Sequence, residues 1–122
     1  MLHWGVPLFA PLAVAVEIRE DGRDSPRRVF RLSRNVAESG LLLERPAPFE
    51  IDQPVTAAFT LPGITATESL CLRARIALTD ADGDGGAGGA ELVFLDPPRD
   101  ARHAIIAYVA GRLGLPGGER EK

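Results

Sequence analysis

An arginine-rich segment is the strongest candidate for chemistry in this sequence. Residues 23–34 hold five arginines and one acid, Asp24, so their local charge is +4. The arginines are Arg23, Arg27, Arg28, Arg31 and Arg34. Guanidinium groups bind phosphate through paired hydrogen bonds and stack on purines, so the segment fits a site for a small phosphorylated ligand. Charge runs more often form the solvated outer face of a strand, and that interpretation stays open beside the first.

A second candidate is a loop that matches a calcium-binding pattern. Residues 80–85 read Asp-Ala-Asp-Gly-Asp-Gly, and Glu91 follows at the distance of the pattern's last ligand. Alternating carboxylates on a tight turn suit the hard Ca²⁺ ion. Both flanks show the alternation of strands, whereas the pattern needs helices, and five glycines between residues 83 and 89 make the loop costly to order. We therefore favour a flexible hairpin loop over a calcium site.

The remaining reactive side chains do not form a catalytic or metal-binding group. Cys71 is the only cysteine and lies in an alternating apolar run, which predicts a buried thiol without a disulfide. His103 is expected to be solvated on a helix, and neither it nor His3 has the spacing of metal ligands. Trp4 fits a lid on the core, while an aromatic near a basic loop also fits stacking on a base. We predict no enzyme, no metal site and no cofactor.

Composition places these residues in one small domain that is rich in turns. The chain has 122 residues, of which 45% are hydrophobic and 25% charged, as is typical of a single globular domain. Thirteen glycines and ten prolines favour short strands joined by turns over a helix bundle. A net charge of −3 argues against bulk nucleic-acid binding. Residues 1–16 lack a basic start and continue as an alternating strand, so we expect no signal peptide, no membrane span and a cytoplasmic location.

Periodicity predicts strands followed by one helix. The strands are expected over residues 12–19, 28–32, 41–43, 55–61, 70–78 and 91–95. The second is expected to break over residues 35–40. A closing helix is predicted with Asp96 as N-cap, Pro97 as its first residue and an end at Gly114. Its apolar stripe is Ile105, Tyr108, Val109 and Leu113. Residues 1–115 then form one domain, and residues 116–122 a flexible tail.

Three motifs follow one another in the order of a known family. Residues 35–41, Asn-Val-Ala-Glu-Ser-Gly-Leu, contain a D/N-x-S-x-x-G-like turn followed by an apolar strand. Residues 59–62, Phe-Thr-Leu-Pro, end a strand in Leu-Pro, and residues 93–96, Val-Phe-Leu-Asp, lead into the closing helix. With these motifs the chain resembles the PilZ family of small bacterial domains. The resemblance implies an all-β fold, a six-stranded antiparallel β-barrel with a C-terminal α-helix.

PilZ domains are receptors for cyclic di-GMP or adaptors in motility and surface attachment, so the resemblance also implies site residues. It implies that Asn35 reads a guanine edge, and that Gly40 permits a backbone conformation that other residues would not tolerate. Ser39 lies in the same turn. Ala37 departs from the family, which has serine there, and the lost hydroxyl contact is worth on the order of 1 kcal/mol.

A second departure concerns the phosphate clamp. The family carries an R-x-x-x-R motif before the first strand, and its arginines clamp the phosphates and stack on the bases of the nucleotide. Residues 2–7 of this chain contain no arginine. Arg27-x-x-x-Arg31 has the same spacing but follows the first strand, so the spacing alone does not place it in the same pocket.

Two functions remain open at this point. The first, which the missing clamp favours, is a non-catalytic adaptor that regulates motility or surface behaviour through a protein partner and binds cyclic di-GMP weakly or not at all. The second is a receptor for cyclic di-GMP or a related cyclic dinucleotide. Its candidate ligand-binding residues are Arg27, Arg28, Arg31, Arg34, Asn35, Ser39, Gly40 and Trp4. A homodimer through a strand edge or through the leucines after Gly40 also stays open.

Overall fold

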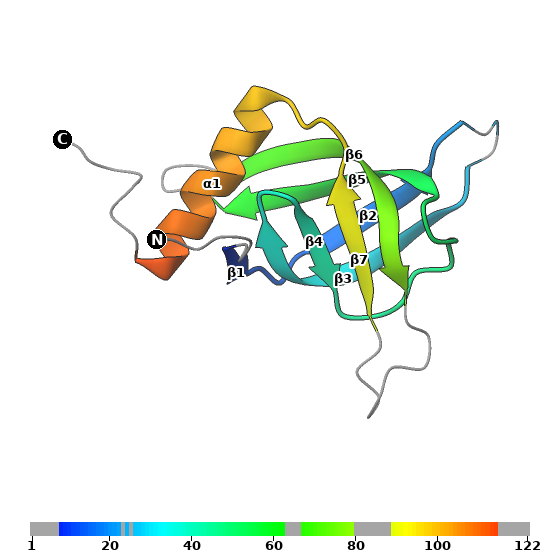
Figure 1. Cartoon of the computed structure of the whole chain (residues 1–122), viewed down its shortest axis with the longest axis horizontal. Helices are drawn as coiled ribbons and strands as arrows, with labels where there is room; N and C mark the ends of the chain where they lie inside the picture. The colour runs from blue at the N-terminus through cyan, green and yellow to red at the C-terminus, as the bar shows by residue number, and fades with distance from the viewer. Residues whose placement is uncertain (1–7, 23, 25, 63–66, 80–88, 115–122) are drawn as a thin grey trace.

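Seven strands precede one helix in the part of the chain that the computed structural model describes, which is residues 8–22, 24, 26–62, 67–79 and 89–114 (Figure 1). The strands are β1 (Phe9–Pro11), β2 (Ala15–Glu20), β3 (Arg28–Ala37), β4 (Gly40–Leu43), β5 (Pro54–Pro62), β6 (Thr67–Thr79) and β7 (Ala90–Phe94), and the helix is α1 (Arg99–Leu113). His3, Trp4, the Asp-Gly loop at residues 80–85 and the tail at residues 116–122 lie outside the described residues.

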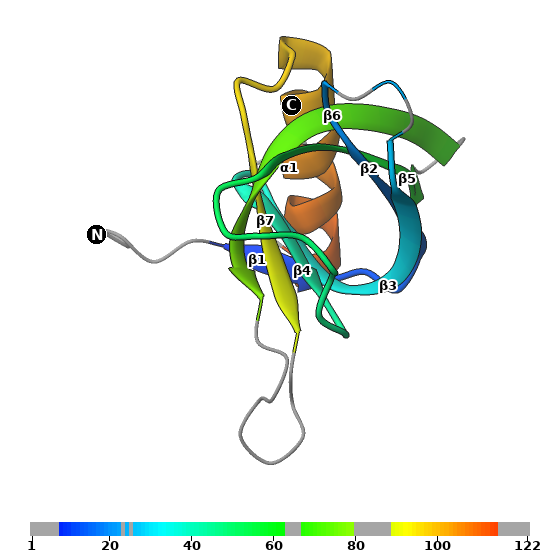
Figure 2. The ribbon, with the colours of Figure 1, turned by 90° about the vertical axis from the view of Figure 1, so that its right-hand side faces the viewer.

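Strands β2 to β7 form a closed antiparallel barrel. Within the sheet, β3, β2, β5, β6, β7 and β4 neighbour one another in that order, and a pairing of β3 with β4 closes the ring. β1 pairs with the end of β3. Figure 2 looks into the barrel from the end opposite α1. The six-stranded antiparallel barrel with a C-terminal helix, which the sequence predicted by resemblance, is confirmed.

Alternation along the strands separates the barrel's interior from its outer surface. In β6, Leu72 and Ile76 are buried, whereas Cys71 and Arg73 are exposed. The predicted strand is therefore confirmed, but the prediction of a buried thiol is wrong. Cys71 has the outward parity of its strand, and no helix of the described residues covers that side of the sheet, so the position opposite the apolar set is exposed.

Strand β3 is longer than the sequence predicted. It does not break at Asn35 but continues to Ala37, and only Glu38 and Ser39 form the turn before β4. A register irregularity between Ser33 and Asn35 lets the strand bend. Its first half pairs with β2, and its second half pairs with β1 on one edge and β4 on the other. The polar Asn35 is thus held by pairing on both edges, which local turn preference did not reveal.

Ser33 joins the chain where it passes from β1 to β2. The residue is fully buried, and its hydroxyl accepts a hydrogen bond from the Val14 amide at 3.0 Å. The same hydroxyl donates to the carbonyl of Leu12. The Ser33 amide in turn donates to the Val14 carbonyl at 2.9 Å. These bonds satisfy backbone groups in a stretch that belongs to no strand, as buried polar groups require.

Helix α1 closes one end of the barrel, as Figure 1 shows on the left. It begins two residues later than predicted: Asp96 has a positive φ of 49°, and Pro98 occupies the N-cap position without a side-chain cap. Asp96 therefore belongs to the connecting turn. Ile105 and Val109 are buried against the barrel, and Gly114 ends the helix in the left-handed conformation, as predicted.

The rest of the predicted stripe of α1 is only partly covered. Tyr108 is half-buried, and its hydroxyl donates a hydrogen bond to the Pro11 carbonyl at 2.7 Å, which ties α1 to β1. Leu113, in contrast, is 41% exposed. No helix of the described residues is long and apolar enough to cross a bilayer.

Candidate functional site

Arg23 of the segment at residues 23–34 lies outside the described residues. The other four arginines of the segment are divided between two sides of the chain at β3. Residues directly opposite one another in a sheet share a face, and Arg31 lies opposite the buried Val16. Arg31 therefore has inward parity. Arg28 and Arg34 have the opposite parity and are exposed. The alternation of the strand therefore separates these side chains whether or not a ligand is bound.

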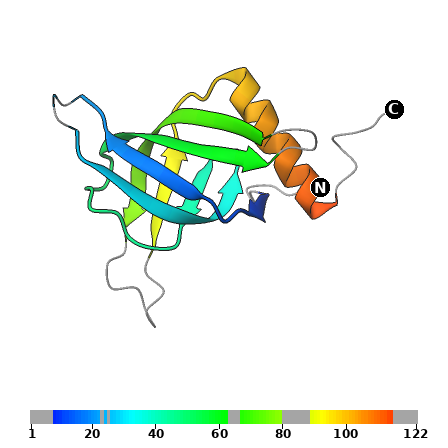
Figure 3. The ribbon, with the colours of Figure 1, turned by 180° about the vertical axis from the view of Figure 1, so that it is seen from behind.

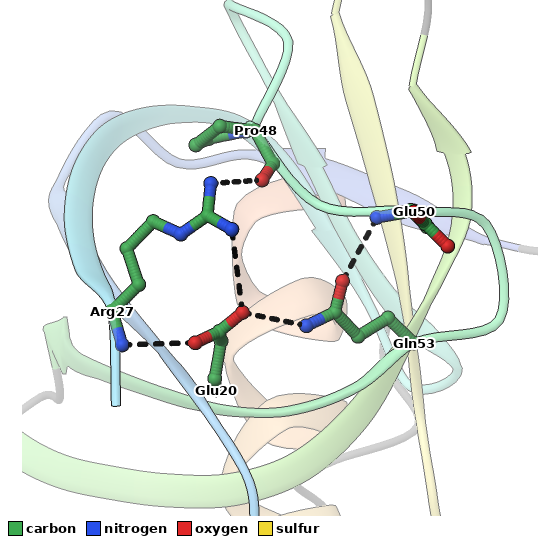
Figure 4. Close-up of polar contacts among 5 residues, drawn as sticks. All are labelled: Glu20, Arg27, Pro48, Glu50 and Gln53. Atoms are coloured by element: carbon green, nitrogen blue, oxygen red, sulfur yellow. Dashed lines mark hydrogen bonds and ion pairs between the residues drawn. The ribbon is translucent and has the colours of Figure 1, made fainter. Parts of the chain in front are cut away.

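Arg27 fastens the loop between β4 and β5 to the end of the barrel (Figure 4). Its Nη1 donates to the Pro48 carbonyl at 2.8 Å, and its Nη2 lies 3.5 Å from Glu20 Oε2. Its backbone amide donates to Glu20 Oε1 at 3.0 Å. The guanidinium also lies over the ring of Phe49, with 5.3 Å from Cζ to the centroid, a cation–π geometry.

Glu20 is the buried carboxylate at the centre of this network. Only 5% of the residue is exposed, and Gln53 Nε2 donates to its Oε2 at 3.0 Å. Gln53 Oε1 accepts the backbone amide of Glu50 at 2.9 Å, so the loop is held at a second point (Figure 4). A buried carboxylate is tolerated when donors surround it in this way. The network therefore serves to anchor the loop.

A pocket of about 410 Å³ opens beside this network. It is lined by Glu20, Arg27, Pro48, Glu50, Ile51, Asp52 and Gln53. Most of its polar groups already bind one another, as the preceding contacts show. Nowhere in the described ranges do three or more histidine, cysteine, aspartate or glutamate side chains gather as a metal-binding group.

The other arginines of the segment have separate surroundings. Arg31 Nε donates to the Pro46 carbonyl at 2.8 Å, so it holds the same loop as Arg27. Arg28 Nη1 binds Glu17 Oε2 at 3.2 Å on the outer surface. Arg34 is exposed and makes no side-chain hydrogen bond or ion pair within the described residues. The structure thus brings Arg27 and Arg31 together at the loop and places Arg28 and Arg34 on the other side of the strand.

The turn between β3 and β4 is held from two directions. The Ser39 carbonyl accepts a hydrogen bond from the Phe94 amide at 2.9 Å, while the Ser39 side chain is exposed. Arg102 of α1 binds the Glu38 carboxylate at 2.9 Å. Asn35 is half-buried at the end of β3. Ser39 of the turn thus lies beside β7, and Asn35 lies in β3 between β1 and β4, away from the loop that Arg27 and Arg31 hold.

Gly40 is required by space. A Cβ at this position would collide with the Leu92 carbonyl oxygen of β7. The φ angle of Gly40 is not in the left-handed region, where, of the described glycines, only Gly22 and Gly114 lie. The predicted unusual backbone conformation of Gly40 is therefore not found, and the close approach of β7 is what excludes a side chain at this position.

Sequence reasoning missed Glu20 and Ser33, the two buried polar residues of the described core. Both carried a signal. Glu20 continues the inward positions of Val16 and Ile18, so the strand period alone places a carboxylate inside the barrel. Ser33 lies two residues after Arg31 on β3 and therefore has the same inward parity. A polar residue at an inward position needs a partner, and both side chains have one.

Comparison with known proteins adds family and fold. A family model described as PilZ domain matches residues 10–111 of the chain. No curated protein matches it. Among solved structures, the inhibitor of motility MotI/DgrA from Bacillus subtilis is similar with a TM-score of 0.77 at 14% identity, covering 98% of this chain and 55% of that chain. The chain therefore spans only about half the length of that protein.

A second similar structure is a separate domain. The PilZ domain of CeSA from a cellulose-synthesizing bacterium is similar with a TM-score of 0.60 at 21% identity, covering 84% of this chain and 95% of that chain. At such identities the two structures show a shared fold.

Proposed function

This chain belongs to the PilZ domain family, a family of non-catalytic receptor and adaptor modules, and from that premise we propose that it is an adaptor. In this proposal the domain regulates motility or surface behaviour by contacting a protein partner, and it binds cyclic di-GMP weakly or not at all. The structurally similar MotI/DgrA is an inhibitor of motility, which fits this role.

One observation carries the proposal: the arginines that would replace the missing clamp do not converge. Arg27 and Arg31 donate to the carbonyls of Pro48 and Pro46, and Arg28 is paired with Glu17. A dinucleotide with two phosphates needs cations that point to one place. Recruiting these arginines would require the β4–β5 loop to be released and an ion pair to be broken.

The turn supports the same function. Ala37 supplies no hydroxyl where the family has serine, and residues 2–7 supply no arginine. Asn35 and Gly40 remain, but Gly40 is needed by the packing of β4 against β7 whether or not a ligand binds. The part of the motif that this chain keeps is therefore accounted for largely by the fold.

A receptor is the second candidate, and one observation favours it. Arg34 directly precedes Asn35, is exposed and has no side-chain partner within the described part of the chain. A single free guanidinium beside the turn offers a first contact for one phosphate.

Calorimetric titration with cyclic di-GMP at moderate salt separates the two candidates. We expect no saturable heat in the micromolar range from a protein whose circular dichroism spectrum shows a folded domain. Arg34→Ala and Asn35→Ala test the receptor, and Arg112→Ala, a change of an exposed arginine on α1, is the matched control. Micromolar or tighter binding that Arg34→Ala or Asn35→Ala removes, and that the control keeps, contradicts the adaptor without nucleotide binding.

A further inference from the structure

One side of the barrel is left uncovered by both α1 and the β4–β5 loop (Figure 3). It is formed by outward residues of β3, β2, β5 and β6, and we call this surface the outer face. Its members, read from the strand register and the exposed positions, are Arg28, Phe30, Leu32, Arg34, Ala15, Glu17, Arg19, Thr56, Ala58, Cys71 and Arg73. Helix α1 lies at one end of the barrel and does not reach across it.

The apolar part of the outer face is a pair of side chains on β3, at one edge of the face. Phe30 is 61% exposed and Leu32 is 45% exposed, and they are successive outward residues of β3. The register continues the row of Phe30 through Glu17 and Ala58 to Cys71. Single exposed apolar residues are ordinary, but a phenylalanine and a leucine on neighbouring outward positions form a continuous apolar surface.

A basic row borders this apolar pair. Arg28 lies directly opposite Arg19, and the row continues through Thr56 to Arg73. Like charges at opposite positions destabilise a sheet, and of these two arginines only Arg28 has an ion pair within the described residues, with Glu17. On the other side of Leu32 lies Arg34, so cations lie at both ends of the apolar pair.

Two carboxylates that contact arginines of the outer face offset its positive charge only in part. Glu17 binds Arg28 at 3.2 Å, and Asp21 lies 3.9 Å from Arg73. Arg19 and Arg34 have no ion pair within the described ranges. Four arginines against these two acids leave a charge of +2 on a chain whose net charge is −3. The outer face is therefore attractive to anions although the chain as a whole is not.

We propose that the outer face is the docking surface for a partner protein that presents carboxylates around an apolar contact, with Phe30 as the residue that makes this contact. This inference rests on the proposed adaptor function and names its surface. Aromatic and arginine side chains are the types that dominate binding energy in interfaces. Partner carboxylates would also relieve the repulsion between Arg28 and Arg19.

Two other occupants fit the outer face less well. A second copy that used the same face would bring two surfaces of like charge together, so charge opposes a symmetric dimer. An anionic bilayer would meet the Glu17 carboxylate directly beside Phe30, near the middle of the face. A protein partner can supply donors for that carboxylate, whereas anionic lipid headgroups would repel it.

Cys71 makes the experiment possible without adding a cysteine. The exposed thiol is the only one in the sequence and lies three strands from Phe30, roughly 14 Å away at normal strand spacing. A photo-crosslinker attached there by a maleimide is irradiated in extract of the source cells, and the crosslinked peptide is mapped by mass spectrometry. The captured protein is then purified, and its affinity for the unlabelled domain is measured by interferometry.

We expect the crosslinked peptide to lie in an acidic patch of its protein. Phe30→Glu and Arg19→Glu should each weaken the affinity by about tenfold or more, and raising the salt from about 50 to about 300 mM should weaken it further. Ile51→Glu is the control for Phe30→Glu, because Ile51 is 50% exposed at the far end of the barrel. Arg99→Glu, on α1, is the control for Arg19→Glu. Both controls should change the affinity less than twofold, and thermal unfolding checks that all four variants fold.

A second attachment site makes failure of the surface distinct from failure of the adaptor. In the double variant Cys71→Ser and Ile51→Cys, the crosslinker reports from the loop end instead. Capture from that site alone would contradict docking on the outer face without contradicting the adaptor function. The same holds if Ile51→Glu and Phe30→Glu weaken the affinity equally. Capture from neither site overturns both.

Two further measurements test the rejected occupants. If the domain sediments with phosphatidylglycerol vesicles and Phe30→Glu abolishes this sedimentation, the outer face binds a membrane and not a protein. If sedimentation velocity shows a dimer and Phe30→Glu dissociates it, the outer face binds a second copy of the chain. Either result would contradict the proposal.

Discussion

At Gly40, strand β4 approaches β7 so closely that a side chain would meet the Leu92 carbonyl oxygen. The contact is with backbone, which cannot rotate away as a flexible side chain can. Any substitution must therefore separate two paired strands of the closed barrel. The restriction belongs to the single residue and does not depend on a ligand.

We expect Gly40→Ala to lower the free energy of unfolding by about 1–3 kcal/mol, as overpacking of a core does. Chemical denaturation followed by circular dichroism measures the loss. Gly111→Ala is the matched control, because Gly111 lies in α1 with nothing within 4 Å of an added Cβ. This control should stabilise the domain by about 0.5–1 kcal/mol through helix propensity. Equal stability of the two variants would contradict the steric explanation.

The arginine side chains show what residue spacing predicts and what it does not. Arg27 and Arg31 are four residues apart, so in a strand they share a side, and both hold the β4–β5 loop. Arg28 and Arg34 share the other side for the same reason. These four arginines form one cluster in the sequence, and the period of two of a strand divides them into two pairs. Their carbonyl acceptors, in contrast, come from a loop whose path the sequence does not encode locally.

At the scale of elements, the β4–β5 loop depends on side chains more than on secondary structure. Arg27 contacts it at the Pro48 carbonyl and at the Phe49 ring, and it also binds Glu20. Because Arg27 is about half-exposed, each contact contributes modestly. The contacts act together on one segment, so their loss should appear first as local opening.

We expect Arg27→Ala to lower the free energy of unfolding by about 1 kcal/mol and to speed hydrogen exchange of the amides at residues 49–53. Exchange read by mass spectrometry on peptides from this loop measures the effect. Arg45→Ala changes an exposed arginine of the same loop and should leave the exchange unchanged. If both variants opened the loop equally, the Arg27 contacts would not be what anchors it.

Element positions were well predicted where alternation decides them. The predicted strands at residues 55–61, 70–78 and 91–95 correspond to β5, β6 and β7. The errors fall where tertiary pairing or backbone geometry overrides local preference. Asn35 is a common turn residue, yet strands on both edges hold it in β3. Asp96 is a common N-cap residue, yet its positive φ places it in a turn before the helix.

At the scale of the whole molecule, the proposed function predicts that nucleotide binding can be restored by replacing what the family pattern lacks. Combining His3→Arg, Pro7→Arg and Ala37→Ser creates the R-x-x-x-R spacing before the first strand and the serine of the turn. We expect this triple variant to gain saturable cyclic di-GMP binding in calorimetry, because arginine–phosphate contacts are the strongest ones missing.

The control for this gain adds the same groups elsewhere. His103→Arg and Ala107→Arg place two arginines at the same spacing on exposed positions of α1, and Ala37→Ser is kept. This control should not bind. A folded triple variant without binding would show that the missing motifs do not explain weak recognition, and binding by the control would show that added charge alone is sufficient.

The strands and turns of the fold could be predicted from local sequence patterns. The pairings that close the barrel could not. Alternation and turns indicate hairpins, and the resemblance supplies the barrel. No local pattern specifies that β4 pairs with β7 or β2 with β5, since those partners are far apart in the chain. The outer face was likewise invisible until the register placed Arg19 opposite Arg28 and Phe30 beside Glu17.

Barrel closure has a consequence for how the chain folds. β2, β3 and β4 form one meander and β5, β6 and β7 another, and each pairs strands that are consecutive in sequence. The pairings β2–β5 and β4–β7 are two seams that join the meanders. Local hairpins form with little loss of chain entropy, while the seams require distant segments to meet. We therefore expect the hairpins to form before the seams, and Gly40 lies on one of the two seams that close the barrel.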